Sequence, residues 1–210
     1  MAKIITVAHT KGGVGKSTLA WNLAHALHTA GEVVRIVDLD FQQTLFFINN
    51  LNEDSKMEVL QPQTADELLD IFEDNHGYLI VDLGGFDSDI NRLAMSKSHK
   101  ILIPVSSSVT EIIGFQTFKA ILKDIDATSI NVVLNNIHHR LKEFSTIEQI
   151  VQSENMKLLK TVVRNRSIYK DSLGFGKSVF DTGNKQAIAE IEGLRDELIN
   201  WGETILQNLS

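Results

Sequence analysis

The sequence contains no cysteine, only two prolines, and no uninterrupted apolar run long enough to cross a membrane. Without cysteine the chain forms no disulfide, no thiolate metal site, no iron–sulfur cluster and no cysteine nucleophile. A membrane-spanning helix needs roughly 18 consecutive apolar residues, and in this sequence polar residues end every apolar run before that length. These absences exclude thiol chemistry and fit a protein of the reducing cytoplasm.

Positive charge is also scarce. The formal net charge is -7 and the sequence pI is about 5.5. Dedicated nucleic-acid-binding proteins are usually basic, so the average charge argues against that class, although it can hide a local basic patch. The other proportions, 43% hydrophobic and 22% charged residues, are those of an ordinary globular protein.

Length and hydrophobic patterning predict one α/β domain that spans residues 1–210. Short apolar runs alternate with helical patterns, and several runs are rich in Val and Ile, as strands buried on both faces are. This alternation predicts a three-layer, doubly wound, mostly parallel sheet with helices on both faces. The predicted strands are Ile4–Ala8, Val33–Val37, Tyr78–Val81, Ile101–Val105, Asn131–Leu134 and Leu158–Val163. The predicted helices are Ser17–Thr29, Thr64–Phe72, Ile112–Ile125, Ser145–Ser153 and Gln186–Leu206.

The first predicted strand leads into AHTKGGVGKST (residues 8–18), which has the form of a phosphate-binding loop. Its glycines let the backbone curl so that N–H groups point inward at an anion. The helix that opens near Lys16 adds its positive dipole end. A strand, a glycine-rich turn and a helix in this order predict a nucleotide site. The loop residues expected to bind the nucleotide are Lys11, Gly12, Gly13, Val14, Gly15, Lys16, Ser17 and Thr18.

The loop side chains have predicted roles. Lys16 is expected to reach the outer phosphates, the Ser17 hydroxyl to ligate Mg²⁺, and Thr18 to contact an inner phosphate. One position departs from the usual pattern, because Thr10 stands where the first glycine of the motif is expected and an additional lysine, Lys11, follows it. A chance glycine-rich turn is the alternative, and the strand–helix setting argues against it.

Two further predicted strands end in aspartates. The segment VRIVDLD (34–40) carries Asp38 and Asp40, and LIVD (79–82) ends with Asp82. Ligands of parallel sheets bind beyond the carboxyl ends of the strands, so we expect these aspartates beside the phosphate loop. Asp82 is expected to assist Mg²⁺ binding, and Asp40 to orient an attacking water. For any one aspartate, a helix cap or a turn is the alternative.

The segments KGGVGKST (11–18), VDLD (37–40) and IVDLGG (80–85) resemble the deviant Walker A ATPases of the ParA/MinD group, which share the motif KGGxGK[ST]. Later segments are similar in order and spacing: LIPVSSSVTEIIGF (102–115), VVLNNIHHR (132–140) and TVVRNRSIYKDSLGFGKSVFD (161–181). The resemblance implies a P-loop NTPase fold, with ATP and Mg²⁺ as cofactors and slow hydrolysis of ATP to ADP and phosphate.

The same resemblance implies roles for particular residues. Lys11 corresponds to the lysine that crosses a dimer interface to the partner's phosphates, and a lysine is a strong point charge for this purpose. The implied catalytic residues are Lys11, Lys16 and Asp40, the implied metal ligands are Ser17, Asp38 and Asp82, and either Asn135 or Asn136 contacts adenine. The family commonly continues after the D-x-D motif with Pro-Gln, whereas this chain has Phe41-Gln42, which puts the shape of that loop in question. Leu83-Gly84-Gly85 is compatible with a switch loop.

Charge separates the branches of the family. Residues 188–210 carry five acidic residues against one arginine, so anionic lipid repels this segment and we expect no membrane binding. Residues 157–185 carry seven basic residues against two acidic ones, a net +5, and such a patch gives sequence-independent, salt-sensitive DNA binding. The expected DNA contacts are Arg164, Arg166, Lys170 and Lys177. A solvated basic face, or arginines around the nucleotide base, is the alternative.

Three functions remain open at this point. We favour a small ParA-type partition ATPase that is cytoplasmic, forms a homodimer with ATP and binds non-specific double-stranded DNA on the nucleoid. A ParB-like or other cargo adaptor would stimulate its hydrolysis. The first alternative is an ATP-switched protein-positioning factor without DNA binding. The second is a biosynthetic enzyme similar to dethiobiotin synthetase, against which Lys11 argues, because a site within one subunit needs no lysine from a partner.

Overall fold

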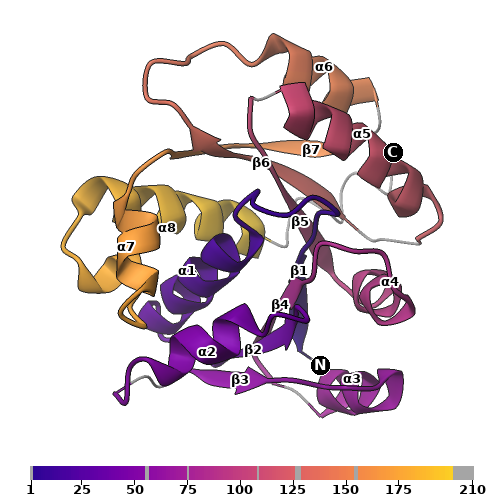
Figure 1. The fold of residues 1–210 in the computed structure, drawn as a ribbon, viewed down its shortest axis with the longest axis vertical. Helices are drawn as coiled ribbons and strands as arrows, with labels where there is room; N and C mark the ends of the chain where they lie inside the picture. Colours follow the sequence, from indigo (N-terminus) through magenta and orange to yellow (C-terminus); the bar gives the residue numbers. More distant parts are fainter. Residues whose placement is uncertain are drawn as a thin grey trace.

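The computed structural model describes residues 2–54, 57–74, 76–107, 109–125, 129–153 and 156–200, with the backbone alone for 109–113. Within these ranges seven strands form one sheet in the order β3-β2-β4-β1-β5-β6-β7, and every neighbouring pair is parallel (Figure 1). The strands are β1 (Lys3–Val7), β2 (Val34–Leu39), β3 (Glu58–Leu60), β4 (Tyr78–Leu83), β5 (Lys100–Val105), β6 (Ile130–Ile137) and β7 (Lys157–Arg164). The predicted parallel, doubly wound sheet is confirmed.

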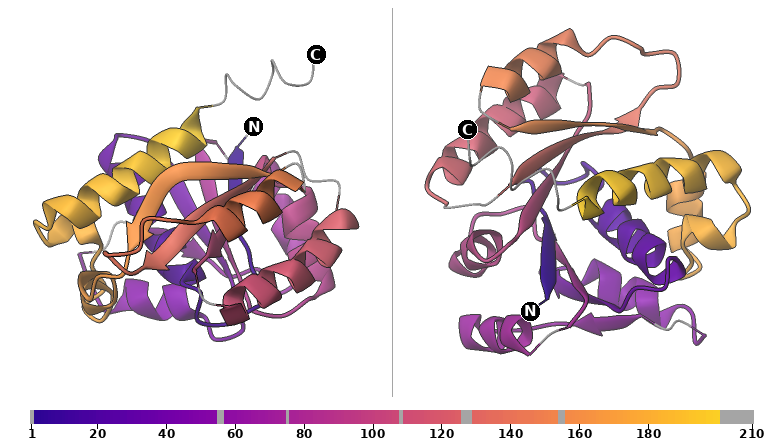
Figure 2. Two further views of the ribbon diagram at one scale, coloured as in Figure 1. Left: turned by 90° about the horizontal axis from the view of Figure 1, so that it is seen from above. Right: turned by 180° about the vertical axis from the view of Figure 1, so that it is seen from behind.

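Helices cover both faces of this sheet (Figures 1 and 2). One face packs against α1, α2, α7 and α8, and the other packs against α3, α4, α5 and α6. The helices are α1 (Lys16–Thr29), α2 (Thr44–Asn50), α3 (Ala65–Glu73), α4 (Asp89–Ser96), α5 (Val109–Lys123), α6 (Ser145–Ser153), α7 (Ile168–Leu173) and α8 (Lys185–Ile199), with a 3-10 turn at Val179–Asp181. No helix among the described residues is long and apolar enough to cross a membrane.

The central strands are buried on both faces because their alternate side chains enter two different cores. In β1, Ile5 and Val7 belong to the core under α1 and α8, whereas Ile4 faces the core under α3–α6. The same alternation holds for Ile80 and Val81 in β4. Successive residues of a strand point to opposite faces, so uninterrupted apolar runs of the sequence become two-sided strands.

All six predicted strands and five predicted helices are present, with bounds that shift by no more than three residues where they fall within the described ranges. The predicted helix Gln186–Leu206 begins at Lys185 and its described part ends at Ile199, while residues 201–206 lie outside the described residues. In this helix Ile191, Leu194 and Leu198 are fully buried, so this apolar face of the helix packs on the sheet.

Four short elements escaped the sequence prediction: β3, α2, α4 and α7. The strand β3 has three residues and lies at the sheet edge, and α2 and α7 have seven and six residues, too few to show a helical period. Helix α4 carries a local cap, in which the Ser88 hydroxyl accepts the Asn91 N–H at 3.3 Å. Pairing with β2 orders β3, and local caps such as that of Ser88 help to begin the short helices.

The strand order aligns three strand ends that matter for the site. Asp82 of β4 lies opposite Asp38 of β2 on one side and opposite Val7 of β1 on the other. Because β1 runs directly into residues 8–18, the glycine-rich loop begins beside both aspartates. Ligands of open parallel sheets bind at this edge.

Candidate nucleotide site

The glycine-rich loop adopts the curled backbone that its sequence predicts. Gly13 and Gly15 have φ values of 79° and 92°, which residues other than glycine rarely adopt. A Cβ on Gly15 would lie 2.5 Å from Nδ2 of Asn135, which donates a 2.7 Å hydrogen bond to the carbonyl oxygen of Val14. Helix α1 begins at Lys16, so its first N–H groups face the loop. The loop and the helix together form an anion-binding cradle.

Lys16 is directed into the interior of this cradle. Its side chain is buried, with 6% of the residue exposed, and Nζ lies 3.5 Å from the carbonyl oxygen of Lys11. Burial lowers the pKa of Lys16, and the negative charges of Asp82 and Asp40 partly offset this effect. A buried ammonium with a weak backbone contact is suited to take phosphate oxygens as its main partners.

Asp82 is fully buried, and neither of its carboxylate oxygens has a properly aligned hydrogen-bond partner among the described residues. Burial raises its pKa to about 8, while the nearby Ser17 hydroxyl and the Lys16 charge lower it and Asp38 and Asp40 raise it further. Buried carboxylates are normally paired with a cation or with donors. The orphaned carboxylate beside Ser17 therefore fits a site for a hydrated Mg²⁺ ion.

Asp38 holds the loop that leads to Asp40. One of its oxygens accepts the N–H of Asp40 at 3.1 Å, and the other accepts the N–H groups of Leu45 and Phe46 at 2.8 and 3.0 Å. Burial raises the pKa of Asp38, and these three hydrogen bonds lower it. The carboxylate thus fixes the beginning of α2. Its expected part in metal binding stays a prediction.

Asp40 lies at the rim of a cavity of about 690 Å³ that contains the glycine-rich loop. One of its carboxylate oxygens accepts the N–H of Gln42 at 3.0 Å, and its carbonyl accepts the N–H of Gln43 at 2.7 Å. These bonds close a tight turn in which Phe41 points outward with 88% of its surface exposed. The Phe41-Gln42 departure from Pro-Gln is therefore accommodated, and the Asp40 side chain stays at the cavity. The cavity is lined by Gly12, Gly13, Gly15, Lys16, Ser17, Thr18, Asp40, Phe41, Gln42, Thr44, Gly85, Phe86 and Lys170.

Lys11 is half-buried at the entrance of the loop, and its N–H donates a 2.9 Å hydrogen bond to Nδ1 of His9. A Cβ added at Gly114 of α5 would lie 3.5 Å from Cδ of Lys11, so the lysine stem runs along that helix. A Cβ at Gly85 would lie 3.4 Å from the Thr10 carbonyl oxygen, so the loop after β4 also packs here. The role of Lys11 across a dimer interface stays a prediction.

A second cavity, of about 300 Å³, lies on the other side of the glycine-rich loop. Its size and its place beside the loop suit the base and sugar of a nucleotide. Asn135 and Asn136 both line it, but the Asn135 amide is bonded to Val14, whereas Asn136 is exposed with a φ of 57°. Further lining residues are Gly13, Val14, Gly15, Thr18, Leu19, Val163, Arg164, Asn165, Arg166, Ser167, Tyr169 and Lys170.

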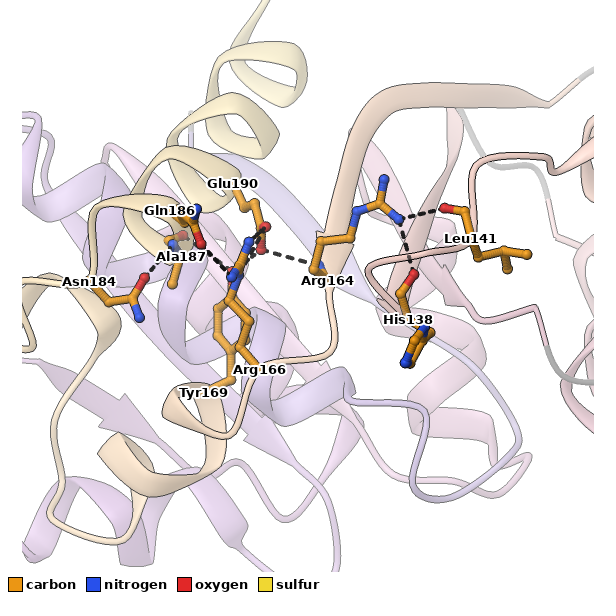
Figure 3. Close-up of polar contacts among 9 residues, drawn as sticks. All are labelled: His138, Leu141, Arg164, Arg166, Tyr169, Asn184, Gln186, Ala187 and Glu190. Carbon is orange, nitrogen blue, oxygen red and sulfur yellow. Dashed lines mark hydrogen bonds and ion pairs between the residues drawn. The ribbon is translucent and has the colours of Figure 1, made fainter.

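The four basic residues expected to contact DNA do not share one environment. Figure 3 shows the guanidinium of Arg164 directed toward the loop after β6 and that of Arg166 directed toward α8. Arg164 donates to the carbonyls of His138 and Leu141, and Arg166 forms an ion pair with Glu190. Lys170 and Lys177 are exposed, and Lys170 borders both cavities. The DNA contacts stay predictions, and the two lysines are the more accessible pair.

Sequence reasoning missed the residues that surround these predicted positions. Phe86 lines the larger cavity together with Gly85 of the predicted switch loop, and Glu190 holds both Arg166 and Tyr169. The sequence signalled Gly85 through the glycine pair after Asp82. Nothing in the sequence pattern distinguished Glu190 from the other acidic residues of its helix.

A parallel α/β sheet with a glycine-rich loop, a buried lysine and an aspartate at the next strand end defines a P-loop nucleotide-binding protein. Residues 5–179 match the family described as the CobQ/CobB/MinD/ParA nucleotide binding domain, and the chain belongs to this family. The ATPases of the ParA/MinD group bind ATP together with Mg²⁺. They act in positioning or partition.

Curated relatives and a solved structure agree with this placement. The chain is 28% identical over 207 residues to the maintenance of carboxysome distribution protein A of Halothiobacillus neapolitanus, covering 93% of this chain and 95% of the relative. It is 24% identical over 194 residues to a protein ParA of Rhizobium radiobacter, covering 87% of each chain. The structure of MinD complexed with Mg-ADP from Pyrococcus horikoshii has the same fold, with a TM-score of 0.72 and 15% identity over 97% of this chain and 99% of that one.

The burial of Asp82 predicts a pH-dependent stability difference. Its carboxyl binds a proton more tightly in the folded state, where its pKa is about 8, than in the unfolded state near the usual 3.8. Its contribution to stability therefore falls as pH rises from about 4 to 8. We therefore compare the melting temperatures of Asp82→Asn and the wild type without nucleotide. We expect the variant's melting temperature minus that of the wild type to be higher at pH 8 than at pH 5 by about 5 °C or more.

The control for this measurement is Asp87→Asn. Asp87 is an exposed carboxylate paired with Arg92 at 2.7 Å, and this pairing lowers its pKa. Asp87 is ionised throughout the same pH range, so the difference in melting temperature between Asp87→Asn and the wild type should stay constant. A difference for Asp82→Asn that also stays constant would contradict the raised pKa.

Proposed function

We propose that the protein is an ATPase that dimerises when it binds ATP, hydrolyses the ATP slowly to ADP and phosphate, and thereby positions a cargo. The observation that carries this proposal is the fully buried Asp82 carboxylate, which has no aligned partner among the described residues and lies beside Lys16 and Ser17. Ionising a buried carboxyl group that has no partner is costly, which is why its pKa is raised, and a bound cation would compensate the charge. Nucleotide with Mg²⁺ supplies that cation at this place.

Ser17 and Asp82 are the residues that would hold Mg²⁺, with Asp38 fixing the neighbouring loop. Mg²⁺ usually keeps several waters and binds through one or two protein oxygens plus substrate phosphates, so no larger ligand cluster is needed. When bound, the ion neutralises charge on the phosphates. Lys16 would add a second positive charge from inside the cradle, and Asp40, which lines the cavity, would orient a water.

The cargo can be a nucleic acid or a protein assembly. The printed names of two relatives differ in this respect, since one maintains carboxysome distribution and the other is a ParA protein. A ParB-like or other adaptor protein would couple the cargo to ATP hydrolysis. The exposed Phe41 and Phe86 at the cavity mouth offer apolar surface that a second subunit would cover on dimerisation.

Lys11→Ala tests the dimer. Because Lys16 occupies the cradle independently, we expect the variant to bind ATP within about threefold of the wild-type Kd and to stay monomeric with ATP and Mg²⁺ on a sizing column. Lys16→Ala is the matched control and should lose ATP binding itself. A Lys11→Ala protein that dimerises like the wild type would show that the additional lysine does not cross the interface.

We further propose that the ATP-bound dimer binds DNA without sequence preference, through Lys170 and Lys177 rather than through the engaged Arg164 and Arg166. Exposed lysines on α7 and in the following loop can contact phosphates at little cost. This activity would place the cytoplasmic protein on the nucleoid. The ion pair of Arg166 with Glu190 favours the second candidate function, a protein-positioning switch without DNA binding, because it removes one free positive charge from the segment.

DNA binding is tested with random-sequence duplex DNA, with ATP, ADP or no nucleotide, across a salt series. Asp40→Ala is used to hold the ATP state. We expect binding with ATP alone, and Lys177→Ala should weaken it by about threefold and reduce the salt slope by about one. Lys97→Ala, an exposed lysine at the end of α4 on the opposite face, is the control and should bind as the parent does.

The other outcomes of this experiment separate the candidate functions. ATP-dependent dimers that bind no DNA in any nucleotide state would favour the protein-positioning switch. A protein that binds nucleotide and forms no dimer would favour the biosynthetic enzyme.

A further inference from the structure

The carboxylate of Glu190, on α8, accepts four hydrogen bonds from residues 164–169 (Figure 3). One oxygen accepts Nε and Nη2 of Arg166 at 3.1 and 2.7 Å. The other accepts the hydroxyl of Tyr169 at 2.8 Å and the backbone N–H of Arg164 at 3.1 Å. With 14% of its side chain exposed, Glu190 is largely shielded from water. It is therefore the hub of a network that joins α8 to the segment after β7.

This network fixes the orientation of Arg166. A third donor of the guanidinium, Nη1, bonds the side-chain oxygen of Gln186 at 2.7 Å, so three of its five N–H groups are directed at α8. Arg166 also lines the cavity of about 300 Å³ beside the glycine-rich loop. A guanidinium whose donor edge is engaged still offers its flat face, which stacks well on aromatic rings.

Tyr169 belongs to the same wall. Tyr169 is buried and lines the cavity, and its hydroxyl is held by Glu190 and by the carbonyl oxygen of Ala187 at 3.2 Å. Burial and the neighbouring negative charge of Glu190 raise the pKa of Tyr169, so the hydroxyl stays protonated and donates. Glu190 thus fixes two planar groups of one cavity without lining the cavity itself.

We propose that Glu190 is a positioning residue for the base of the bound nucleotide: by holding Arg166 and Tyr169, it shapes a flat wall that takes a purine. This inference rests on the proposed function, because it assumes that the phosphates occupy the adjacent glycine-rich loop. A preformed wall binds more tightly than one that must be ordered at the moment of binding. The base, rather than the phosphates, is the part of the ligand that Glu190 controls.

The same helix contains a natural comparison. Glu197 lies seven residues further along α8 and also accepts donors of β7, namely the N–H groups of Lys160 and Thr161 and the Thr161 hydroxyl, at 2.6 to 2.7 Å. None of these residues lines either nucleotide cavity. Both glutamates therefore attach α8 to the edge strand. Of the two, only Glu190 holds residues that line the cavity.

The test measures binding of ATP, GTP and inorganic tripolyphosphate, each with Mg²⁺, by calorimetry. Glu190→Gln keeps the size of the side chain and removes its charge. Loss of charged hydrogen bonds to Arg166 should raise the Kd for ATP about tenfold and the Kd for GTP by a similar factor, because the wall stacks on either purine. The Kd for tripolyphosphate, which has no base, should change by less than about twofold.

Glu197→Gln is the matched control and should leave the ratio of ATP to tripolyphosphate affinity as in the wild type. If Glu190→Gln fails to fold, Gln186→Ala removes the Nη1 bond of Arg166 alone and should raise the ATP Kd about threefold in the same selective manner.

The proposal is overturned if Glu190→Gln weakens ATP and tripolyphosphate equally, if it changes neither, or if Glu197→Gln has the same selective effect. A wild-type protein that binds neither ligand would instead refute the proposed function, and this inference with it.

Discussion

The site depends on one buried carboxyl group at the carboxyl edge of the sheet. The parallel order β2-β4-β1 places Asp82 between Asp38 and the end of β1, inside the protein and without an aligned hydrogen bond from the described residues. Ionising this group in the unliganded protein costs stability, and a bound cation would offset that cost. The glycine-rich loop, Lys16 and Ser17 surround the place where Mg²⁺ and phosphates would supply the compensation.

The second organising feature is α8, which joins the two sides of the site. Its carboxylates hold the edge strand β7, and Arg195 donates to the Ala26 carbonyl of α1 at 3.3 Å. Helix α1 is also tied to the segment after α7, because Trp21 donates to the Lys177 carbonyl at 3.2 Å. The helix that begins at the glycine-rich loop and the residues that line the cavity of about 300 Å³ are thus parts of one packed layer.

The sequence predicted the features that local patterns encode. Two-sided strands appear as uninterrupted apolar runs, and the loop requires glycine at Gly13 and Gly15, so the sheet and the phosphate cradle could be anticipated. The helix α2 could not, because its start is fixed by Asp38 from another strand. The pairing of Arg166 with Glu190 could not be anticipated either. The net charge of residues 157–185 does not include the acidic residues of α8 that pack against them. Contacts between distant segments determine whether a basic side chain is paired, and the composition of one segment does not show these contacts.

The most direct test of this account is the Mg²⁺ dependence of ATP binding. We would measure the Kd for ATP by calorimetry in the wild type and in Asp82→Asn, with Mg²⁺ and with EDTA. If the buried carboxylate exists for the cation, Mg²⁺ should strengthen ATP binding by about tenfold or more in the wild type and by much less in the variant. Equal strengthening in both proteins would contradict the central role of Asp82.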